Sequence, residues 1–236
     1  TTTRTAGLGS GSTFPVGVNT VTYTAMDGAG NSTSCSFTVT VVDNIPPTLA
    51  CPANITVNAT AGTCGKVVTY IAPVGADNCS GVTTTRTAGL ASGSIFPVGV
   101  STVTYTATDG AGSSTSCSFT VTVVDNIPPV LACPANISVN ATAGTCGKVV
   151  TYVAPVGTDN CSGVTTARTA GLASGSTFPV GVNTVTYTAT DGAGNSTSCS
   201  FTVTVVDNIP PAITGCPSNI SVNAGAACTA TASWTV

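Results

Sequence analysis

Hydrophobic and polar residues alternate along several short stretches of this chain. Val103, Tyr105 and Ala107 occupy every second position, and threonines fill the positions between them. The stretches 55–60 and 117–123 alternate in the same way. A period of two with many β-branched residues is typical of strands that bury one face. The pattern therefore predicts a protein built from β-strands.

Proline and glycine interrupt the alternating stretches at short intervals. They occur together or repeatedly at 46–47, 92–93, 97–99 and 110–112. This punctuation leaves no room for a helix longer than about one turn. We expect an all-β fold with about seven short strands in roughly 80 residues, arranged as an immunoglobulin-like or fibronectin-III-like antiparallel β-sandwich. An up-and-down barrel is the alternative.

The sequence repeats itself with a period of 82 residues. The motif Asp-Asn-Ile-Pro-Pro begins at Asp43, Asp125 and Asp207. Residues 43–124 and 125–206 are therefore two complete copies of one domain. They differ at Thr48/Val130, Thr56/Ser138, Ile71/Val153, Ala76/Thr158, Thr85/Ala167, Ile95/Thr177, Ser101/Asn183 and Ser113/Asn195.

Two partial copies flank the complete repeats. Residues 1–42 match 83–124, so we expect them to be the C-terminal half of a repeat. Residues 207–236 match the front of a repeat and diverge from it, which predicts the N-terminal half of another copy. No signal peptide opens the chain, and Thr1 falls in the middle of the pattern. We therefore expect an excerpt of a longer repeat array.

The composition removes several classes of function. Charged residues make up 6% of the chain, against about 25% in ordinary globular domains. Histidine is absent, as are glutamate and glutamine, which removes most acid–base and metal-ligand chemistry. No basic surface exists for a nucleic acid partner. We expect no enzyme and no catalytic residue.

The cysteines indicate an oxidising compartment. The chain has 11 Cys but no Cys-x-x-Cys motif and no histidine to complete the common mixed zinc sites. This combination favours disulfides, which are rare in the cytosol. The mean hydropathy is +0.42, yet no apolar run approaches the roughly 18 residues that cross a bilayer. We expect a secreted or cell-surface location without membrane insertion.

Six motifs follow one another in the repeat and carry a family resemblance. They are Asp-Asn-x-Pro-Pro, then Cys-Pro-x-Asn-Ile from Cys51, Asp-Asn-Cys-Ser-Gly from Asp77, Ser-Gly-Ser-x-Phe-Pro-Val-Gly from Ser92, Val-Thr-Tyr-Thr-Ala-Thr-Asp from Val103 and Cys-Ser-Phe-Thr-Val from Cys117. Over the whole chain they resemble the HYR, or hyalin, repeat. The resemblance implies extracellular, immunoglobulin-like modules associated with cell adhesion. Long arrays of near-identical copies resemble the stalks of giant bacterial cell-surface adhesins.

The resemblance also bears on the disulfide pairing. Family members with two cysteines keep the pair that corresponds to Cys51 and Cys117. In a head-to-tail rod of sandwiches, the strand directions also place these two residues at the same pole of the repeat. We therefore predict the pairs Cys51–Cys117 and Cys133–Cys199.

The pairing of Cys64 has two solutions. Cys64 opens a strand at the opposite pole, so about eight strand residues put it some 25 Å from Cys79 unless the intervening loop folds back. A disulfide needs Cα atoms within about 7 Å. Either the loop folds back and Cys64 pairs with Cys79, as Cys146 would with Cys161, or Cys64 pairs with Cys161 of the next repeat. The first solution lets one repeat complete its own bonds, and the second staples repeats together.

The aspartates occupy three places in the repeat: the linker, the loop around Asp77 and the loop before the last strand. Strand directions bring all three places to one junction between repeats. Carboxylates gathered there suit Ca²⁺, which is the one cofactor we consider, although the fold requires none. The alternative is that aspartates cap turns. The candidate ligands are Asp43, Asp77 and Asp109, and in the next repeat Asp125, Asp159 and Asp191.

These features favour a structural function. We expect a disulfide-stabilised extracellular stalk whose Pro-Pro linkers limit bending and whose main partners are neighbouring repeats of the same chain. One alternative is a module that binds a glycan or protein receptor on an extracellular surface. The other is a filament of several copies, in which the half-repeat of one chain completes that of another.

Overall fold

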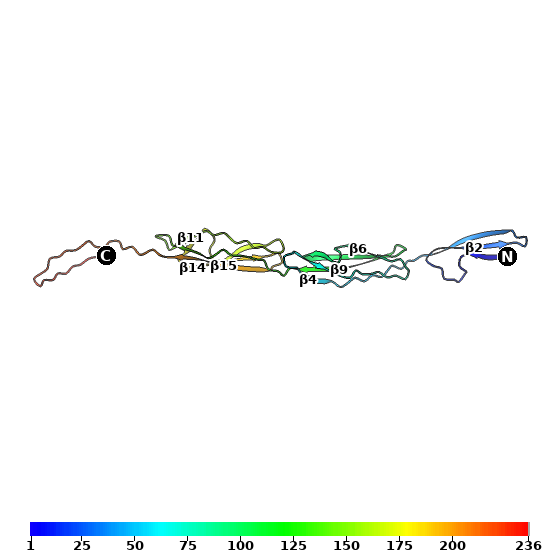
Figure 1. The fold of residues 1–236 in the computed structure, drawn as a ribbon, viewed down its shortest axis with the longest axis horizontal. Helices are drawn as coiled ribbons and strands as arrows, with labels where there is room; N and C mark the ends of the chain where they lie inside the picture. The colour runs from blue at the N-terminus through cyan, green and yellow to red at the C-terminus, as the bar shows by residue number, and fades with distance from the viewer. Residues whose placement is uncertain (236) are drawn as a thin grey trace. The chain divides into compact units, whose positions relative to one another are not determined.

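The computed structural model describes residues 1–235. The chain forms two compact units, Thr1–Ile127 and the unit that begins at Pro128, and each is described by itself (Figure 1). All regular structure in the described residues is β-strand, as the alternating pattern predicts. Within these residues the structure contains no helix long and apolar enough to cross a membrane.

The complete repeat in the first unit is a β-sandwich with one large and one small sheet. The large sheet has the order β4-β9-β8-β6, and the small sheet pairs β5 with β7. The first strand, β4, runs parallel to β9, and all the other pairs are antiparallel. The strands are β4 (Ile55–Asn58), β5 (Gly65–Val68), β6 (Thr83–Ala88), β7 (Ser94–Pro97), β8 (Gly99–Thr108) and β9 (Ser114–Val124).

The second unit repeats this arrangement. Its large sheet has the order β10-β15-β14-β12, and β11 pairs with β13. Each repeat thus has six strands instead of the expected seven or so, and an isolated bridge adds one further backbone pairing. This bridge joins Thr48 to Ala76, and Val130 to Thr158. The strands are β10 (Ile137–Asn140), β11 (Gly147–Val149), β12 (Thr165–Ala170), β13 (Thr177–Pro179), β14 (Gly181–Thr190) and β15 (Ser196–Val206).

The partial repeats show what the second sheet contributes. Residues 1–42 form only the sheet β1 (Thr2–Ala6), β2 (Gly17–Met26) and β3 (Ser32–Val41). On β3, Phe37 is 52% exposed, whereas its counterpart Phe119 on β9 is 2% exposed. The same phenylalanine is therefore buried only where the small sheet covers it. Residues 207–235 contain no strand.

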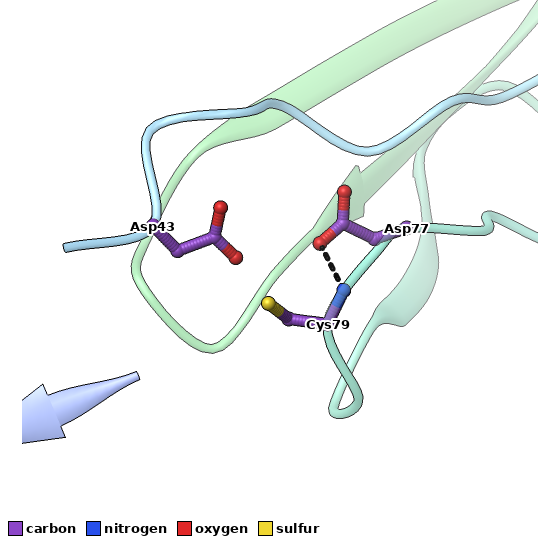
Figure 2. Close-up of side chains that lie close together, drawn as sticks. All are labelled: Asp43, Asp77 and Cys79. Carbon is purple, nitrogen blue, oxygen red and sulfur yellow. Dashed lines mark hydrogen bonds between the residues drawn. The ribbon is translucent and has the colours of Figure 1, made fainter. Parts of the chain in front are cut away.

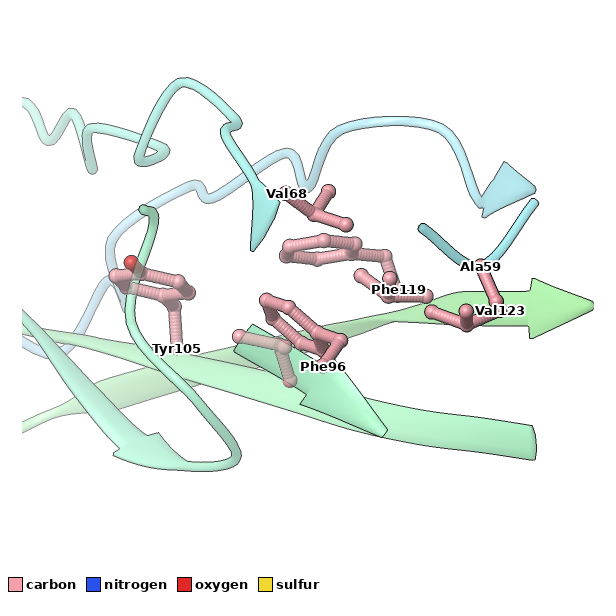
Figure 3. Packing of buried hydrophobic residues seen from close by; sticks show 8 residues of the cluster. Ala59, Val68, Phe96, Tyr105, Phe119 and Val123 are labelled. Atoms are coloured by element: carbon pink, nitrogen blue, oxygen red, sulfur yellow. The ribbon is translucent and has the colours of Figure 1, made fainter. Parts of the chain in front are cut away.

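The core of the first complete repeat lies between its two sheets (Figure 3). The large sheet contributes alternate residues, so the period-two pattern places apolar side chains inside and threonines outside. Full burial of each large apolar side chain stabilises the fold by about 1.5–3 kcal/mol. The buried cluster consists of Ala59, Val68, Phe96, Val103, Tyr105, Phe119, Val121 and Val123.

Two tyrosines close one end of this core. The Tyr70 hydroxyl donates to the carbonyl oxygen of Leu90 at 2.7 Å, and the Tyr105 hydroxyl donates to that of Tyr70 at 3.4 Å. The Tyr70 ring packs edge-on against Phe119 with a centroid distance of 5.0 Å. Burial and the hydrogen bond with Tyr105 raise the pKa of Tyr70 to about 12. Both hydroxyls are thus engaged within the repeat, and these tyrosines are packing residues.

A glycine fixes the bulge at the edge of the large sheet. The pairing of β6 with β8 shifts register between Arg86 and Ala88. Gly89 follows with φ +81°, and a Cβ atom there would collide with the carbonyl oxygen of Thr102. Gly93 also has a positive φ, of +84°, but a Cβ there would meet no atom within 4 Å. Comparing the two positions therefore distinguishes the cost of a left-handed backbone from the cost of a steric collision.

Replacing this glycine in both complete repeats, as Gly89→Ala with Gly171→Ala, should destabilise each repeat by about 1 kcal/mol from the left-handed backbone and about 1–3 kcal/mol more from the collision. The control pair Gly93→Ala with Gly175→Ala should lose only the first amount, because these sites are open. Urea unfolding of the three chains measures the difference. Equal losses in the two variants would show that the close approach at the bulge carries no cost.

Candidate functional site

Three of the predicted site residues meet at one pole of the first complete repeat (Figure 2). One ligand-type atom from each of Asp43, Asp77 and Cys79 lies within 4.8 Å of the others, and all three residues are half-buried. The linker is held against the loop by the bridge at Thr48 and Ala76, with N–H···O distances of 2.7 and 2.9 Å. We call this group the Asp-Cys cluster.

The aspartates at this pole are engaged as caps of their own loops. Asp43 Oδ1 accepts a hydrogen bond from the Ile45 N–H at 3.2 Å, and Asp77 Oδ2 accepts one from the Cys79 N–H at 3.1 Å. In the loop after β8, Asp109 Oδ1 accepts from two backbone N–H groups, at 2.9 and 2.8 Å. These are turn-stabilising contacts that aspartate commonly makes. The structure therefore contains the turn-capping contacts that the alternative to Ca²⁺ binding predicts.

The thiol of Cys79 is held in its protonated form. A hydrogen bond with the Asp43 carboxylate, burial, and the negative charges of Asp43, Asp77 and Asp109 together raise the pKa of Cys79. The thiolate is the form of cysteine that attacks and that binds metals. The cluster thus disfavours nucleophilic or redox catalysis at this cysteine.

The cluster fits a Ca²⁺ site only in part. Ca²⁺ takes six to eight oxygen ligands, and a thiol is not among its preferred donors. The structure gathers Asp43 and Asp77 with Cys79, and it places Asp109 outside that group of ligand atoms. Ca²⁺ binding by Asp43, Asp77 and Asp109, or by their counterparts Asp125, Asp159 and Asp191, stays a prediction.

That prediction has a direct test. If Ca²⁺ bridges these carboxylates, adding millimolar Ca²⁺ to the metal-free chain should raise its thermal unfolding midpoint by several degrees, and excess chelator should reverse the rise. Asp77→Asn with Asp159→Asn should abolish the response, because each variant keeps the side-chain shape but loses a charge. An unchanged midpoint would leave the aspartates as loop caps.

One difference between the repeats leaves a carboxylate oxygen without a hydrogen bond. In the second complete repeat, the Asn195 side chain donates to Asp191 Oδ2 at 2.8 Å. Burial raises the pKa of Asp191, but hydrogen bonds from Asn195 and the backbone lower it by more, so the pKa lies below its ordinary value. In the first repeat Ser113 occupies the position of Asn195, and Asp109 Oδ2 is buried without a partner. The sequence comparison showed the substitution but not this consequence.

Ser113→Asn should stabilise the first complete repeat, because the new amide can donate to Asp109 as Asn195 does to Asp191. We expect its unfolding midpoint in differential scanning calorimetry to rise by about 4 °C. The reciprocal change Asn195→Ser should lower the midpoint of the second repeat. A midpoint that stays the same or falls with Ser113→Asn would contradict the assignment.

The cysteines divide into bonded and free groups. Disulfides join Cys51 to Cys117 and Cys133 to Cys199, each with a Cα–Cα distance of 5.6 Å, and these are the pairs that the resemblance implied. Cys64 and Cys161 are also in disulfide bonds. Free thiols are carried by Cys35, Cys79, Cys146, Cys216 and Cys228.

The pairing of Cys64 with Cys79 is therefore not formed, and neither is that of Cys146 with Cys161. The Cys64 carbonyl accepts a hydrogen bond from the Val98 N–H, just before β8, and Cys79 lies in a cleft with Gly110, just after β8. The ten residues of β8 separate these ends by about 30 Å. The loop before β6 does not fold back along the strand, so a within-repeat bond is out of reach.

Comparison with known proteins gives the family. Residues 1–41, 42–123 and 124–205 each match the HYR domain. The chain is 40% identical over 227 residues to Hyalin of Strongylocentrotus purpuratus, an alignment that covers 92% of this chain and 19% of that protein. It is 28% identical over 171 residues to the Serine-rich adhesin for platelets of Staphylococcus aureus, covering 61% of this chain and 7% of that protein.

Solved structures align with this chain at low TM-scores. The protocadherin gammaB7 EC3-6 cis-dimer structure aligns with a TM-score of 0.34 and 20% sequence identity, over 81% of this chain and 58% of that one. The three matched stretches together cover residues 1–205. The chain belongs to the HYR domain family, as the motifs of its repeats predict.

Proposed function

We propose that this chain is a structural segment of an extracellular adhesive repeat protein, which holds other parts of that protein at a distance and has no catalytic activity. The names of its relatives, hyalin and a bacterial adhesin, support an adhesive role. Its disulfides support a location outside the cytosol, where such bonds form and persist.

The observation that carries the proposal is the equivalence of the two complete repeats. Both bury the same core and present the same outer face of hydroxyl groups. On this face Thr104 bonds to Ser118 at 2.9 Å, and Thr186 bonds to Ser200 at the same distance. In the described residues, the outward-facing positions of β6, β8 and β9 lack the aromatic and arginine side chains that are enriched in binding surfaces.

A second candidate function, binding of a ligand or of other copies in a filament, is favoured by one surface. The small sheet and the segment after β5 expose Val67, Ile71, Val74 and Ile95 in the first complete repeat. Clustered exposed apolar side chains mark many interaction sites. We call this group the apolar strip, and the second complete repeat exposes Val149, Val153 and Val156 at equivalent positions.

The test distinguishes a spacer from a binder. The chain is attached by its N-terminus to beads that carry a dense polymer brush, with a peptide epitope at the C-terminus. A spacer carries the epitope beyond the brush, so retention on antibody-coated surfaces should rise several-fold over beads that carry the epitope alone. Beads with the chain but without the epitope should not be retained on glycan or matrix-protein surfaces.

Retention no better than that of the bare epitope would contradict the spacer function. Retention without the epitope would support binding instead. The variant Ile71→Ser with Val74→Ser, Val153→Ser and Val156→Ser would then test the apolar strip, because these side chains are exposed and outside the core. Loss of retention in this variant would place the second candidate function on that surface.

A further inference from the structure

The chain carries nine Asn-x-Ser/Thr sequences, the acceptor motif for N-linked glycans in secreted proteins. A glycan replaces one hydrogen on the amide nitrogen of the asparagine, Nδ2, and the folded protein has to leave room for it. The surroundings of Nδ2 therefore separate the motifs that accommodate a glycan from those that do not. The motifs begin at Asn31, Asn54, Asn58, Asn78, Asn136, Asn140, Asn160, Asn195 and Asn219.

Four of these amide nitrogens are turned into their own loops. The nitrogen of Asn195 donates to Asp191 Oδ2 at 2.8 Å, and that of Asn78 donates to Cys79 Sγ at 3.3 Å. The corresponding contacts are also made by Asn31 and Asn160. A glycan at any of these four positions would compete with a contact that stabilises the loop.

Asn58 and Asn140 have different surroundings. Each ends the first strand of its repeat, β4 or β10, is exposed, and forms no side-chain hydrogen bond within the described residues. Ala59 follows Asn58 and is only 9% exposed, so the alternation of an extended backbone turns Asn58 and Thr60 to solvent together. The acceptor amide and the hydroxyl of the motif are thus both accessible.

The backbone of this motif is held at the edge of the large sheet. The Ala59 N–H donates to the Val124 carbonyl oxygen at 2.8 Å, and the Thr60 N–H donates to that of Gly65 at 2.9 Å. Both corresponding distances in the second complete repeat are 2.9 Å. Because β4 is the outermost strand of its sheet, a glycan on Asn58 has solvent beside it and obstructs pairing of this edge with another chain.

An exposed valine lies beside each acceptor. Asn58 is the register partner of Val124 in the parallel pairing of β4 with β9, and Asn140 is that of Val206 in the second complete repeat. Val124 is 40% exposed and Val206 is 43% exposed. The C–H face of a sugar ring can cover apolar surface of this kind and remove it from water.

We propose that Asn58 and Asn140 are acceptors of N-linked glycans, whose first sugar packs against Val124 or Val206. In the transfer, the asparagine Nδ2 loses a proton and bonds to C1 of an oligosaccharide carried on a lipid pyrophosphate. The bond from C1 to the pyrophosphate oxygen breaks, and the lipid pyrophosphate leaves. This site goes beyond the proposed function, since it is occupied or empty independently of whether the chain acts as a spacer.

The experiment uses the full chain, secreted from mammalian cells that make only high-mannose glycans. An endoglycosidase trims each glycan to one N-acetylglucosamine, and mass spectrometry with fragmentation that keeps the sugar on its side chain locates this tag. We expect the tag on Asn58 and Asn140 in most molecules. Unmodified Asn58 and Asn140, or tags confined to the motifs at Asn31 and Asn195, would overturn the proposal.

Two matched variants assign the tag to the motif. Thr60→Ala with Thr142→Ala keeps both asparagines and removes the motif hydroxyl, so both tags should be lost. Thr60→Ser with Thr142→Ser keeps a hydroxyl at the same position, and both tags should be retained. Tags that persist in the alanine variant would contradict the assignment to these motifs.

The contact with the valines is measured by thermal unfolding of the trimmed chain. Asn58→Gln with Asn140→Gln should lower the unfolding midpoint by about 2 °C, because the valines become uncovered. This difference should vanish when Val124→Ser and Val206→Ser are present in both chains. It should persist with the control pair Val100→Ser and Val182→Ser, which changes exposed valines two strands away from the acceptors. Equal midpoints for the tagged and glutamine chains would overturn the packing of the sugar against the valines.

Discussion

The closure of the large sheet by the small one is the contact on which each repeat depends. The large sheet alone presents its apolar side chains to water, as the half-repeat at residues 1–42 does with Phe37. When β5 and β7 cover it, Phe119 and Phe96 become buried, and the tyrosine pair closes the end of the core. Each small sheet is only three or four residues long. A few residues of the small sheet therefore decide whether the apolar face of the large sheet is buried.

The linker is attached to the repeat that follows it. The linker is drawn onto the sandwich through the Thr48–Ala76 bridge, and Pro47 is fully buried beside it. The Pro-Pro segment is thus part of the domain that follows it, rather than a free tether. This attachment brings Asp43 to the loop that carries Asp77 and Cys79, and so creates the Asp-Cys cluster.

The sequence was most informative where one physical rule controls the outcome. Alternation placed Val103 and Phe119 correctly in the core because a half-buried strand has a strict period of two. It could not reveal that β4 pairs in parallel with β9, since periodicity carries no information about strand direction. It also predicted about seven strands where each complete repeat has six, because a short apolar stretch does not fix how many hydrogen bonds form.

The site was less predictable for a different reason. Topology brought Asp43 and Asp77 together as expected, but the position of Asp109 depends on hydrogen bonds within its own hairpin loop. The unmatched oxygen of Asp109 arises from one change, Ser113 for Asn195, whose effect requires the side-chain geometry. Cys79 likewise keeps a free thiol because Cys64 and Cys79 lie at opposite ends of β8.

The Cys51–Cys117 bond sets a limit on how far a repeat can stretch. The two cysteines are 66 residues apart, which leaves 16 of the 82 residues of a repeat outside the bond. If tension pulls the sheets apart, only these residues straighten, to about 55 Å, whereas a fully extended repeat without the bond would reach about 290 Å. The disulfide therefore confines most of the residues of each repeat and limits the extension that unfolding can add.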